Sequence, residues 1–229
     1  MSLRRAISAV LSGTLVISLM SSVSAKSGPF RYVANSEMKI ALTFDDGPHK
    51  RYTEEILGIL DEFGIKATFF VIGRNCEENP KAVQHIIERG HEIGNHTYSH
   101  PHLSKITAEE LTEEINRTEK LLLECFNYRP RLFRPPEGIY SSEIAGALQK
   151  LDYLPVLWTV DTADWRRPTS KEIAENVIDN ISAGRIILCH DYVSGESSTP
   201  EALKSFIPEL LSRGYVFVTV SELIESARE

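Results

Sequence analysis

Apolar positions follow two different spacings along this chain. Short, mostly apolar runs predict strands, whereas longer stretches whose apolar residues return every three or four positions predict helices. The expected strands cover residues 39–44, 67–72, 92–95, 131–134, 153–160, 185–190 and 215–220. The expected helices cover residues 54–63, 80–89, 107–125, 141–150, 170–181, 200–213 and 221–226. Thr107 with Glu110 and Thr169 with Glu172 predict capping boxes at two of the helix starts.

Strands and helices alternate along the whole of this pattern, and several strands are apolar on both faces. Such strands are typical of a parallel sheet that is covered by helices. The glycine-rich phosphate-binding turn of open, doubly wound sheets does not follow the first expected strand. We therefore expect an α/β fold, a (β/α) barrel with about seven parallel strands, and not an open sheet.

The N-terminal segment differs from this pattern. Arg4 and Arg5 precede an apolar stretch over residues 6–20, and Val-Ser-Ala at residues 23–25 matches a signal-peptidase cleavage pattern. These features predict a secretory signal peptide over residues 1–25, with retention as a membrane anchor as the alternative. Residues 26–37 are then expected to form a leader with an edge strand at 30–33, and residues 38–229 a single domain.

Charge and cysteine content narrow the class of partner. The chain has 32 acidic and 25 basic residues, and removal of Arg4 and Arg5 with the signal peptide changes the net charge from −7 to −9. Nucleic-acid binding depends on basic residues, so a neutral or cationic polymer is the better expectation for the binding partner.

Three cysteines do not make a disulfide framework. A disulfide between Cys76 and Cys125 remains possible from the sequence. Cys189 lies in an apolar run and is expected to be a small buried hydrophobic residue.

Polar side chains gather immediately after the expected strands. They are Asp45 and Asp46, His96 and His100, Arg134, Asp161 with Asp164 and Trp165, and His190 with Asp191. The C-terminal ends of parallel strands form one edge of the sheet, where barrel enzymes build their active sites. This one-sided distribution predicts an active site at that edge.

His96 and His100 are spaced so that they share one face of a helical turn. Imidazole pairs at this spacing suit a metal, and one added carboxylate would leave coordination positions open. In the helical zinc-protease motif, a Glu that acts as general base follows the first His, whereas Thr97 occupies that position here. A general base for hydrolysis must therefore come from another part of the chain, and Asp45 and Asp46 are the candidates. A two-histidine, one-carboxylate iron oxygenase is a second interpretation, but it predicts an all-β fold that the alternating pattern contradicts.

Five ordered motifs carry a resemblance to a known family. They are Thr-Phe-Asp-Asp-Gly-Pro (43–48), His-Thr-Tyr-Ser-His (96–100), Phe-Arg-Pro-Pro (133–136), Asp-Thr-Ala-Asp-Trp (161–165) and Leu-Cys-His (188–190). Together they resemble the polysaccharide deacetylases (the NodB homology domain, carbohydrate esterase family four) over residues 38–225. The resemblance implies a distorted (β/α) barrel, in agreement with the strand count.

The resemblance also implies a role for each motif residue. Asp46, His96 and His100 would hold a divalent metal, zinc first and cobalt second. Asp45 would deprotonate metal-bound water, Arg134 would keep Asp45 charged, His190 would protonate the leaving amine and Asp164 would orient His190. The substrate would be contacted by Pro136, Glu137, Trp165 and Leu188, with a backbone N–H after Pro136 stabilising the oxyanion. Many family members carry an aromatic residue where this chain has Glu137.

The function that follows from the resemblance is an exported, metal-dependent N-deacetylase. Its substrate would be N-acetylglucosamine-type sugar of peptidoglycan or a chitin-like polysaccharide, outside the cell or in the cell wall. Nucleic-acid binding and a membrane span after signal cleavage are not expected, and the oligomeric state is left open. The alternative is a non-catalytic glycan-binding or cell-wall module on the same barrel, which loss of a catalytic or metal-binding residue would favour.

Overall fold

The computed structural model describes residues 28–34, 37–193 and 195–226. The expected signal peptide over residues 1–25 lies outside these described residues. The strands are β1 (Lys39–Asp45), β2 (Thr68–Val71), β3 (Glu92–Asn95), β4 (Leu132–Phe133), β5 (Leu154–Pro155), β6 (Val160–Asp161), β7 (Ile186–His190) and β8 (Val216–Val218). The helices are α1 (Tyr52–Glu62), α2 (Gly73–Glu78), α3 (Pro80–Glu88), α4 (Ala108–Phe126), α5 (Ser142–Lys150), α6 (Ser170–Asn180), α7 (Thr199–Ser212) and α8 (Val220–Glu225). Short 3-10 helices are η1 (Leu103–Lys105), η2 (Pro136–Gly138) and η3 (Asp164–Arg166).

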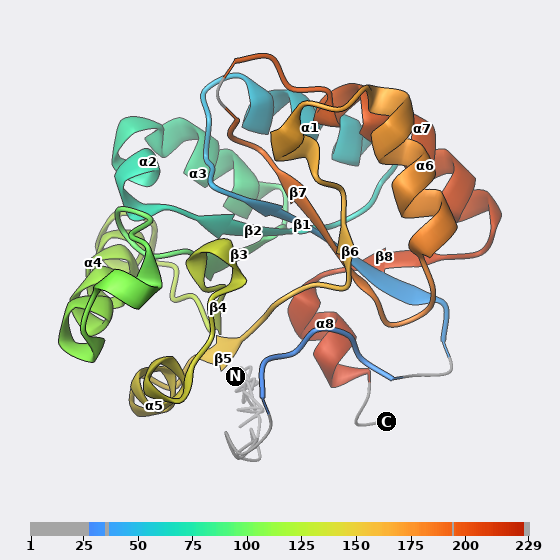
Figure 1. Cartoon of the computed structure of the whole chain (residues 1–229). Helices are drawn as coiled ribbons and strands as arrows, with labels where there is room; N and C mark the ends of the chain where they lie inside the picture. Colours follow the sequence, from blue (N-terminus) through green and yellow to red (C-terminus); the bar gives the residue numbers. More distant parts are fainter. Residues whose placement is uncertain (1–27, 35–36, 194, 227–229) are drawn as a thin grey trace, which may run out of the picture.

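The strands form one parallel sheet in the order β5-β4-β3-β2-β1-β7-β6, and β8 also pairs with β1. The sheet curls into a partly closed barrel, and the helices lie around its outside (Figure 1). The expected fold class is therefore confirmed. The capping boxes predicted at Thr107 and Thr169 are also present, at the starts of α4 and α6.

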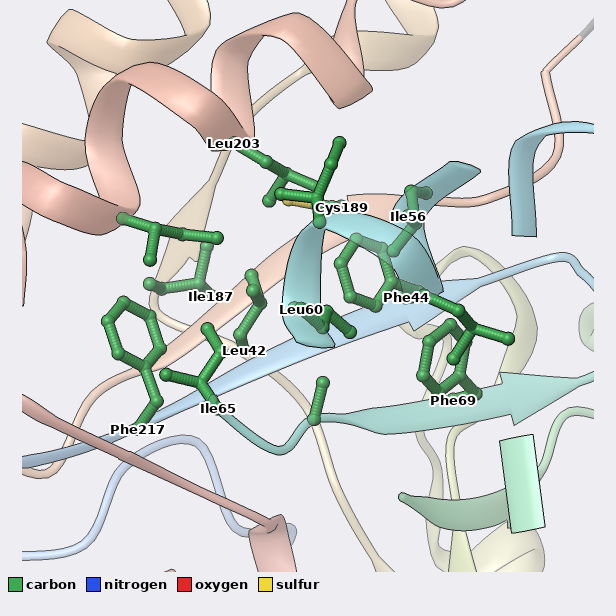
Figure 2. Packing of buried hydrophobic residues seen from close by; sticks show 14 of the residues in the cluster. Leu42, Phe44, Ile56, Leu60, Ile65, Phe69, Ile187, Cys189, Leu203 and Phe217 are labelled. Carbon is green, nitrogen blue, oxygen red and sulfur yellow. The ribbon is translucent and has the colours of Figure 1, made fainter. Parts of the chain in front are cut away.

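Strand β1 lies at the centre of the sheet, and its alternating side chains separate the core from the site. Ile40, Leu42 and Phe44 are fully buried in the main apolar cluster, which packs the sheet against α1 and α7 (Figure 2). Thr43 and Asp45 point to the opposite face, because side chains alternate along a strand. That face is the inside of the barrel, so the strand that forms the core also carries polar groups into the site.

The expected strand over residues 153–160 is wrong as a single element. It divides into β5 and β6, which lie at opposite ends of the strand order. The backbone N–H of Val156 still donates to Phe133 on β4, whereas the N–H of Thr159 donates to Ile186 on β7. The chain thus crosses the opening of the curled sheet between these residues, and an apolar run cannot reveal such a change of partner.

One further expectation is wrong, one helix was not predicted, and one question about the cysteines is answered. Residues 30–33 are not a strand: Phe30 and Tyr32 make isolated bridges to Val156 and Arg185. Helix α2 was not predicted, because its sequence Gly-Arg-Asn-Cys-Glu-Glu has no apolar periodicity. The Cys76–Cys125 disulfide that the sequence left possible is not formed, since all three cysteines are free. Cys189 is buried, as expected. Among the described residues, every helix is too short or too polar to cross a membrane.

Candidate active site

A cavity of about 460 Å³ opens at the C-terminal ends of the strands. It is lined by eight of the predicted site residues: Asp45, Asp46, His96, His100, Glu137, Trp165, Leu188 and His190. Arg134, Asp164 and Pro136 are buried. Polar groups that are far apart in the sequence therefore meet at one edge of the sheet, as the strand-end pattern indicates.

Asp46, His96 and His100 converge on one point. Oδ1 of Asp46 lies 3.4 Å from Nε2 of His96 and 3.4 Å from Nε2 of His100. The three potential ligand atoms lie within 4.8 Å of one another. Oδ1 of Asp46 is buried and accepts no hydrogen bond from the described residues. An unpaired carboxylate oxygen that faces two imidazole nitrogens fits a divalent metal such as zinc, which three protein ligands bind with one position left open.

The surroundings orient these groups for metal binding. Nδ1 of His96 lies 2.7 Å from the carbonyl oxygen of Arg134 and can donate to it, which presents Nε2 to Asp46. Metal-binding histidines commonly donate their second ring N–H in this way. Burial raises the pKa of Asp46, but interactions with His96, and with His190 and His100, together outweigh burial and lower that pKa overall. Asp46 is therefore ionised and ready to bind a cation at neutral pH.

Asp45 forms a fully buried ion pair with Arg134. Nη1 of Arg134 donates to Oδ1 of Asp45 at 2.7 Å and to the hydroxyl of Thr43 at 2.8 Å, and Nη2 donates to the carbonyl of Leu157 at 3.2 Å. The guanidinium also lies 4.0 Å from the centre of the Phe70 ring. Burial lowers the pKa of Arg134, and the charge of Asp45 opposes this shift. The pair fixes the Asp45 carboxylate beside Asp46.

His190 and Asp164 form a second pair across the cavity. Nδ1 of His190 lies 2.6 Å from Oδ1 of Asp164, whose Oδ2 accepts from the His190 backbone N–H at 2.8 Å and from the Thr199 hydroxyl at 2.7 Å. Burial lowers the pKa of His190, but the hydrogen bond and charge of Asp164, together with the charges of Asp45 and Asp46, outweigh it and raise that pKa to about 9. The imidazole is therefore protonated at neutral pH and can act as an acid.

Replacement of Asp164 tests this pair. In Asp164→Asn, the pKa of His190 should fall from about 9 towards its ordinary value of ~6.5, because burial then acts against a weaker opposing charge. Stability from the pair is fully present below pH ~6.5 and is lost as pH rises through about 9. NMR titration of the His190 ring in metal-free protein measures the shift, with Asp161→Asn as the control. An unchanged His190 pKa in Asp164→Asn would contradict the assignment.

The predicted substrate contacts differ in their positions. Leu188 is buried on β7, whereas Trp165 in η3 is 53% exposed at the mouth of the cavity. Glu137 has a left-handed backbone with a φ of 55°, and its Oε2 lies 3.5 Å from Nε2 of His102. Pro136 is not among the residues that line the cavity. Glu137, Trp165 and Leu188 therefore line the space that a substrate would occupy, whereas Pro136 is buried outside the lining.

Sequence reasoning missed one lining residue and left two acidic residues unassigned. Trp158 lines the cavity. It lies between β5 and β6, in the segment that was expected to be a continuous strand. Asp161 also lines the cavity and accepts the backbone N–H of Ala163 at 2.8 Å. Asp191 is buried, accepts the Thr53 hydroxyl, and has its pKa raised by burial to about 7. In the sequence, both aspartates lie next to motif residues, which suggested that they are near the site. That position could not show which of them lines the cavity and which has a structural role.

The fold and the site together define a barrel enzyme with an Asp-His-His centre, and comparison places it in a family. The chain belongs to the polysaccharide deacetylase family, whose model matches residues 33–156. A similar protein is a peptidoglycan-N-acetylglucosamine deacetylase of Bacillus cereus, 40% identical over 194 residues, with 84% of this chain and 91% of the relative covered.

Solved structures share the fold. A peptidoglycan N-acetylglucosamine deacetylase superposes with a TM-score of 0.82 at 37% identity, over 87% of this chain and 94% of the other. A pseudoenzyme of carbohydrate esterase family four from Bacillus anthracis has a TM-score of 0.81 at 31% identity, over 87% and 69%. A family 4 acetyl xylan esterase from Clostridium thermocellum, in complex with a cobalt ion, has a TM-score of 0.76 at 34% identity, over 82% and 90%. Since a pseudoenzyme shares the fold, activity must be argued from the residues of the site.

Proposed function

We propose that this protein is an exported, metal-dependent hydrolase that removes N-acetyl groups from N-acetylglucosamine-type sugars of peptidoglycan or a chitin-like polysaccharide. One observation carries the proposal: the Asp46, His96 and His100 cluster lies in one cavity with the Asp45–Arg134 pair and the His190–Asp164 pair. Asp45, a proton acceptor, and His190, a proton donor, thus lie beside the Asp46, His96 and His100 cluster, whose side chains are of the kinds that bind metals. This is the set of groups that hydrolysis of an unreactive amide requires.

The metal would be held by Asp46, His96 and His100. A divalent ion there, zinc first and cobalt second, supplies a Lewis acid that polarises the acetyl carbonyl and makes water more acidic. The cobalt ion of the esterase from Clostridium thermocellum supports a divalent metal in this fold. The unpaired, buried Oδ1 of Asp46 supports the same assignment in this chain.

The residues of the chain would carry the proton transfers. Asp45 accepts a proton from the attacking water, whose oxygen bonds to the acetyl carbon. As the carbon–nitrogen bond breaks, His190 gives its proton to the departing nitrogen, and the products are acetate and a free amine. The Asp164 carboxylate stabilises the charged form of His190 before this transfer.

The remaining groups bind the substrate. Trp165 and Leu188 would form the walls around the acetyl group, because both line the cavity. The backbone N–H of Glu137, which follows Pro136, would stabilise the developing oxyanion. The predicted signal peptide supports action outside the cell, where these polysaccharides are found. The peptidoglycan deacetylase from Bacillus cereus supports a cell-wall substrate.

The proposal is tested by acetate release from the purified protein. We expect acetate from N-acetylglucosamine oligomers or peptidoglycan, loss of release to background after chelation, and recovery when Zn²⁺ or Co²⁺ is restored. His100→Ala should abolish release, because it removes one ligand of the centre. His85→Ala is the matched control, since His85 pairs with Glu54 between the outer helices α1 and α3.

The alternative module predicts a different outcome of the same assay. A protein that binds divalent metal and glycan but releases no acetate from any acetylated glycan would be a non-catalytic wall module. The presence of the base, the acid and the three potential metal ligands in one cavity argues against this alternative.

A further inference from the structure

The loop that carries His96 and His100 has an unfavourable backbone conformation. Thr97 and His100 both lie in the left-handed region, with φ of 69° and 57°, and neither is glycine. Each such residue costs about 1–3 kcal/mol unless its surroundings compensate. Contacts from other parts of the fold must therefore hold the loop in the conformation that brings the two histidines together.

Glu114, on helix α4, supplies such contacts. Its Oε2 accepts the backbone N–H of Tyr98 at 2.9 Å and that of Ser99 at 2.7 Å, and its Oε1 accepts the Ser99 hydroxyl at 2.9 Å. All three donors belong to the segment between the two histidines. Hydrogen bonds to an ionised carboxylate are about twice as strong as those between neutral groups.

Helix α4 is a rigid support for Glu114. Its capping box fixes the start of the helix, and Leu111, Ile115 and Leu122 are buried in the core. A second contact comes from the same helix, because Nδ2 of Asn95 donates to the carbonyl of Ile115 at 3.0 Å, while Oδ1 of Asn95 accepts the N–H of Thr97 at 2.9 Å. Helix α4 therefore contacts the loop directly through Glu114 and indirectly through Asn95.

Helix α2 contacts the loop from another side. The backbone N–H groups of Gly73 and Arg74 donate to the carbonyls of Thr97 and Tyr98, both at 3.0 Å. A side chain at position 73 would meet Thr118 of α4 at 2.5 Å, so α2 and α4 approach closely there (Figure 1). The N–H groups of Tyr98 and Ser99 thus bond to Glu114, and the carbonyls of Thr97 and Tyr98 bond to α2. These contacts leave the loop little freedom to relax.

We propose that Glu114 is a positioning residue that holds the His96–His100 loop in its metal-binding conformation before a metal is bound. The inference rests on the proposed metal site. Glu114 acts through the backbone of the loop, so its loss should weaken metal binding without removal of a ligand. Outer residues that orient metal ligands typically contribute ~10–100-fold in metal affinity.

Metal titration of the full-length, metal-free protein tests the proposal. Co²⁺ binding, followed by absorbance and by calorimetry, should show a Kd raised ~10–100-fold in Glu114→Ala. Glu114→Gln should recover most of the affinity, because its amide oxygen can accept the same two backbone N–H groups. Glu113→Ala is the matched control: Glu113 is the neighbouring, exposed glutamate of α4, and its Kd should equal that of the wild type.

Thermal unfolding of the same metal-free variants separates positioning from stability. If Glu114→Ala is folded at the titration temperature and binds Co²⁺ with the wild-type Kd, the proposal is wrong and Glu114 is only structural. If Glu114→Ala does not fold, Glu114→Asp takes its place, because the shorter side chain draws the carboxylate back from the backbone N–H groups of Tyr98 and Ser99. A folded Glu114→Asp with the wild-type Kd would equally overturn the proposal. Wild-type protein that binds Co²⁺ but releases no acetate would refute the proposed hydrolase and leave this inference standing, whereas wild-type protein without Co²⁺ binding would overturn both.

Discussion

Asp45→Asn is expected to lower kcat for acetate release by ~10²–10⁴-fold, the usual contribution of a general base. The change is nearly isosteric, and its amide oxygen can still accept the Arg134 hydrogen bond that Oδ1 of Asp45 accepts at 2.7 Å. What is lost is the negative charge that would take the proton from water. Steady-state kinetics with saturating metal measure the effect, and Co²⁺ titration should show that the metal still binds.

Asp161→Asn provides the control for Asp45→Asn. Asp161 is a second carboxylate in the lining of the same cavity, but it accepts the backbone N–H of Ala163 and has no predicted part in proton transfer. Its kcat should stay within a few-fold of the wild type. If Asp161→Asn lost as much activity as Asp45→Asn, the two carboxylates would share the role of base or the roles would be exchanged.

Arg134→Met should lower the free energy of unfolding by about 3–5 kcal/mol, because it leaves a buried carboxylate without its partner. Arg134 is fully buried and contacts Asp45, Thr43 and the carbonyl of Leu157. Activity should fall with stability, since the carboxylate of Asp45, the proposed base, is then no longer held in place. Urea denaturation of the variant and the wild type at neutral pH measures the change.

Two further variants sharpen this prediction. Arg129→Met removes a surface guanidinium, 59% exposed, that lies 3.2 Å from Glu119, and it should cost only ~0–1 kcal/mol. Asp45→Asn added to Arg134→Met should restore part of the lost stability, because the unpaired buried charge is removed as well. Strictly additive losses in the double variant would show that the Asp45–Arg134 pair is not the source of the effect.

The candidate site was predictable because its chemistry lies directly at strand ends. Asp45 and His190 occupy the last positions of β1 and β7, and parallel pairing places them opposite each other. Any correct assignment of these strands brings the two side chains to the same edge. The strand pattern alone was therefore sufficient to place the candidate site residues at one edge of the sheet.

The contacts that support the site could not be predicted in the same way. The carbonyl of Leu157 accepts from Arg134 only because the chain crosses the open side of the sheet, where a continuous strand was expected. Glu114 lies on a helix whose many charged residues are indistinguishable in the sequence from a solvated face. Backbone carbonyls and surface-type glutamates carry no sequence signal for such roles, since these depend on which segments meet in three dimensions.

The central position of β1 also has a consequence for how the site comes into existence during folding. The strand pairs with β2, which follows it closely, but also with β7, which brings Asp45 opposite His190 late in the chain. Closing so long a loop is entropically costly, and folds dominated by such distant contacts fold slowly. Asp46, His96 and His100 all lie in the first half of the chain, whereas His190, the proposed proton donor, joins them only when β7 pairs with β1. The proposed acid and the proposed metal ligands therefore depend for their meeting on one of the most distant strand pairings in the chain.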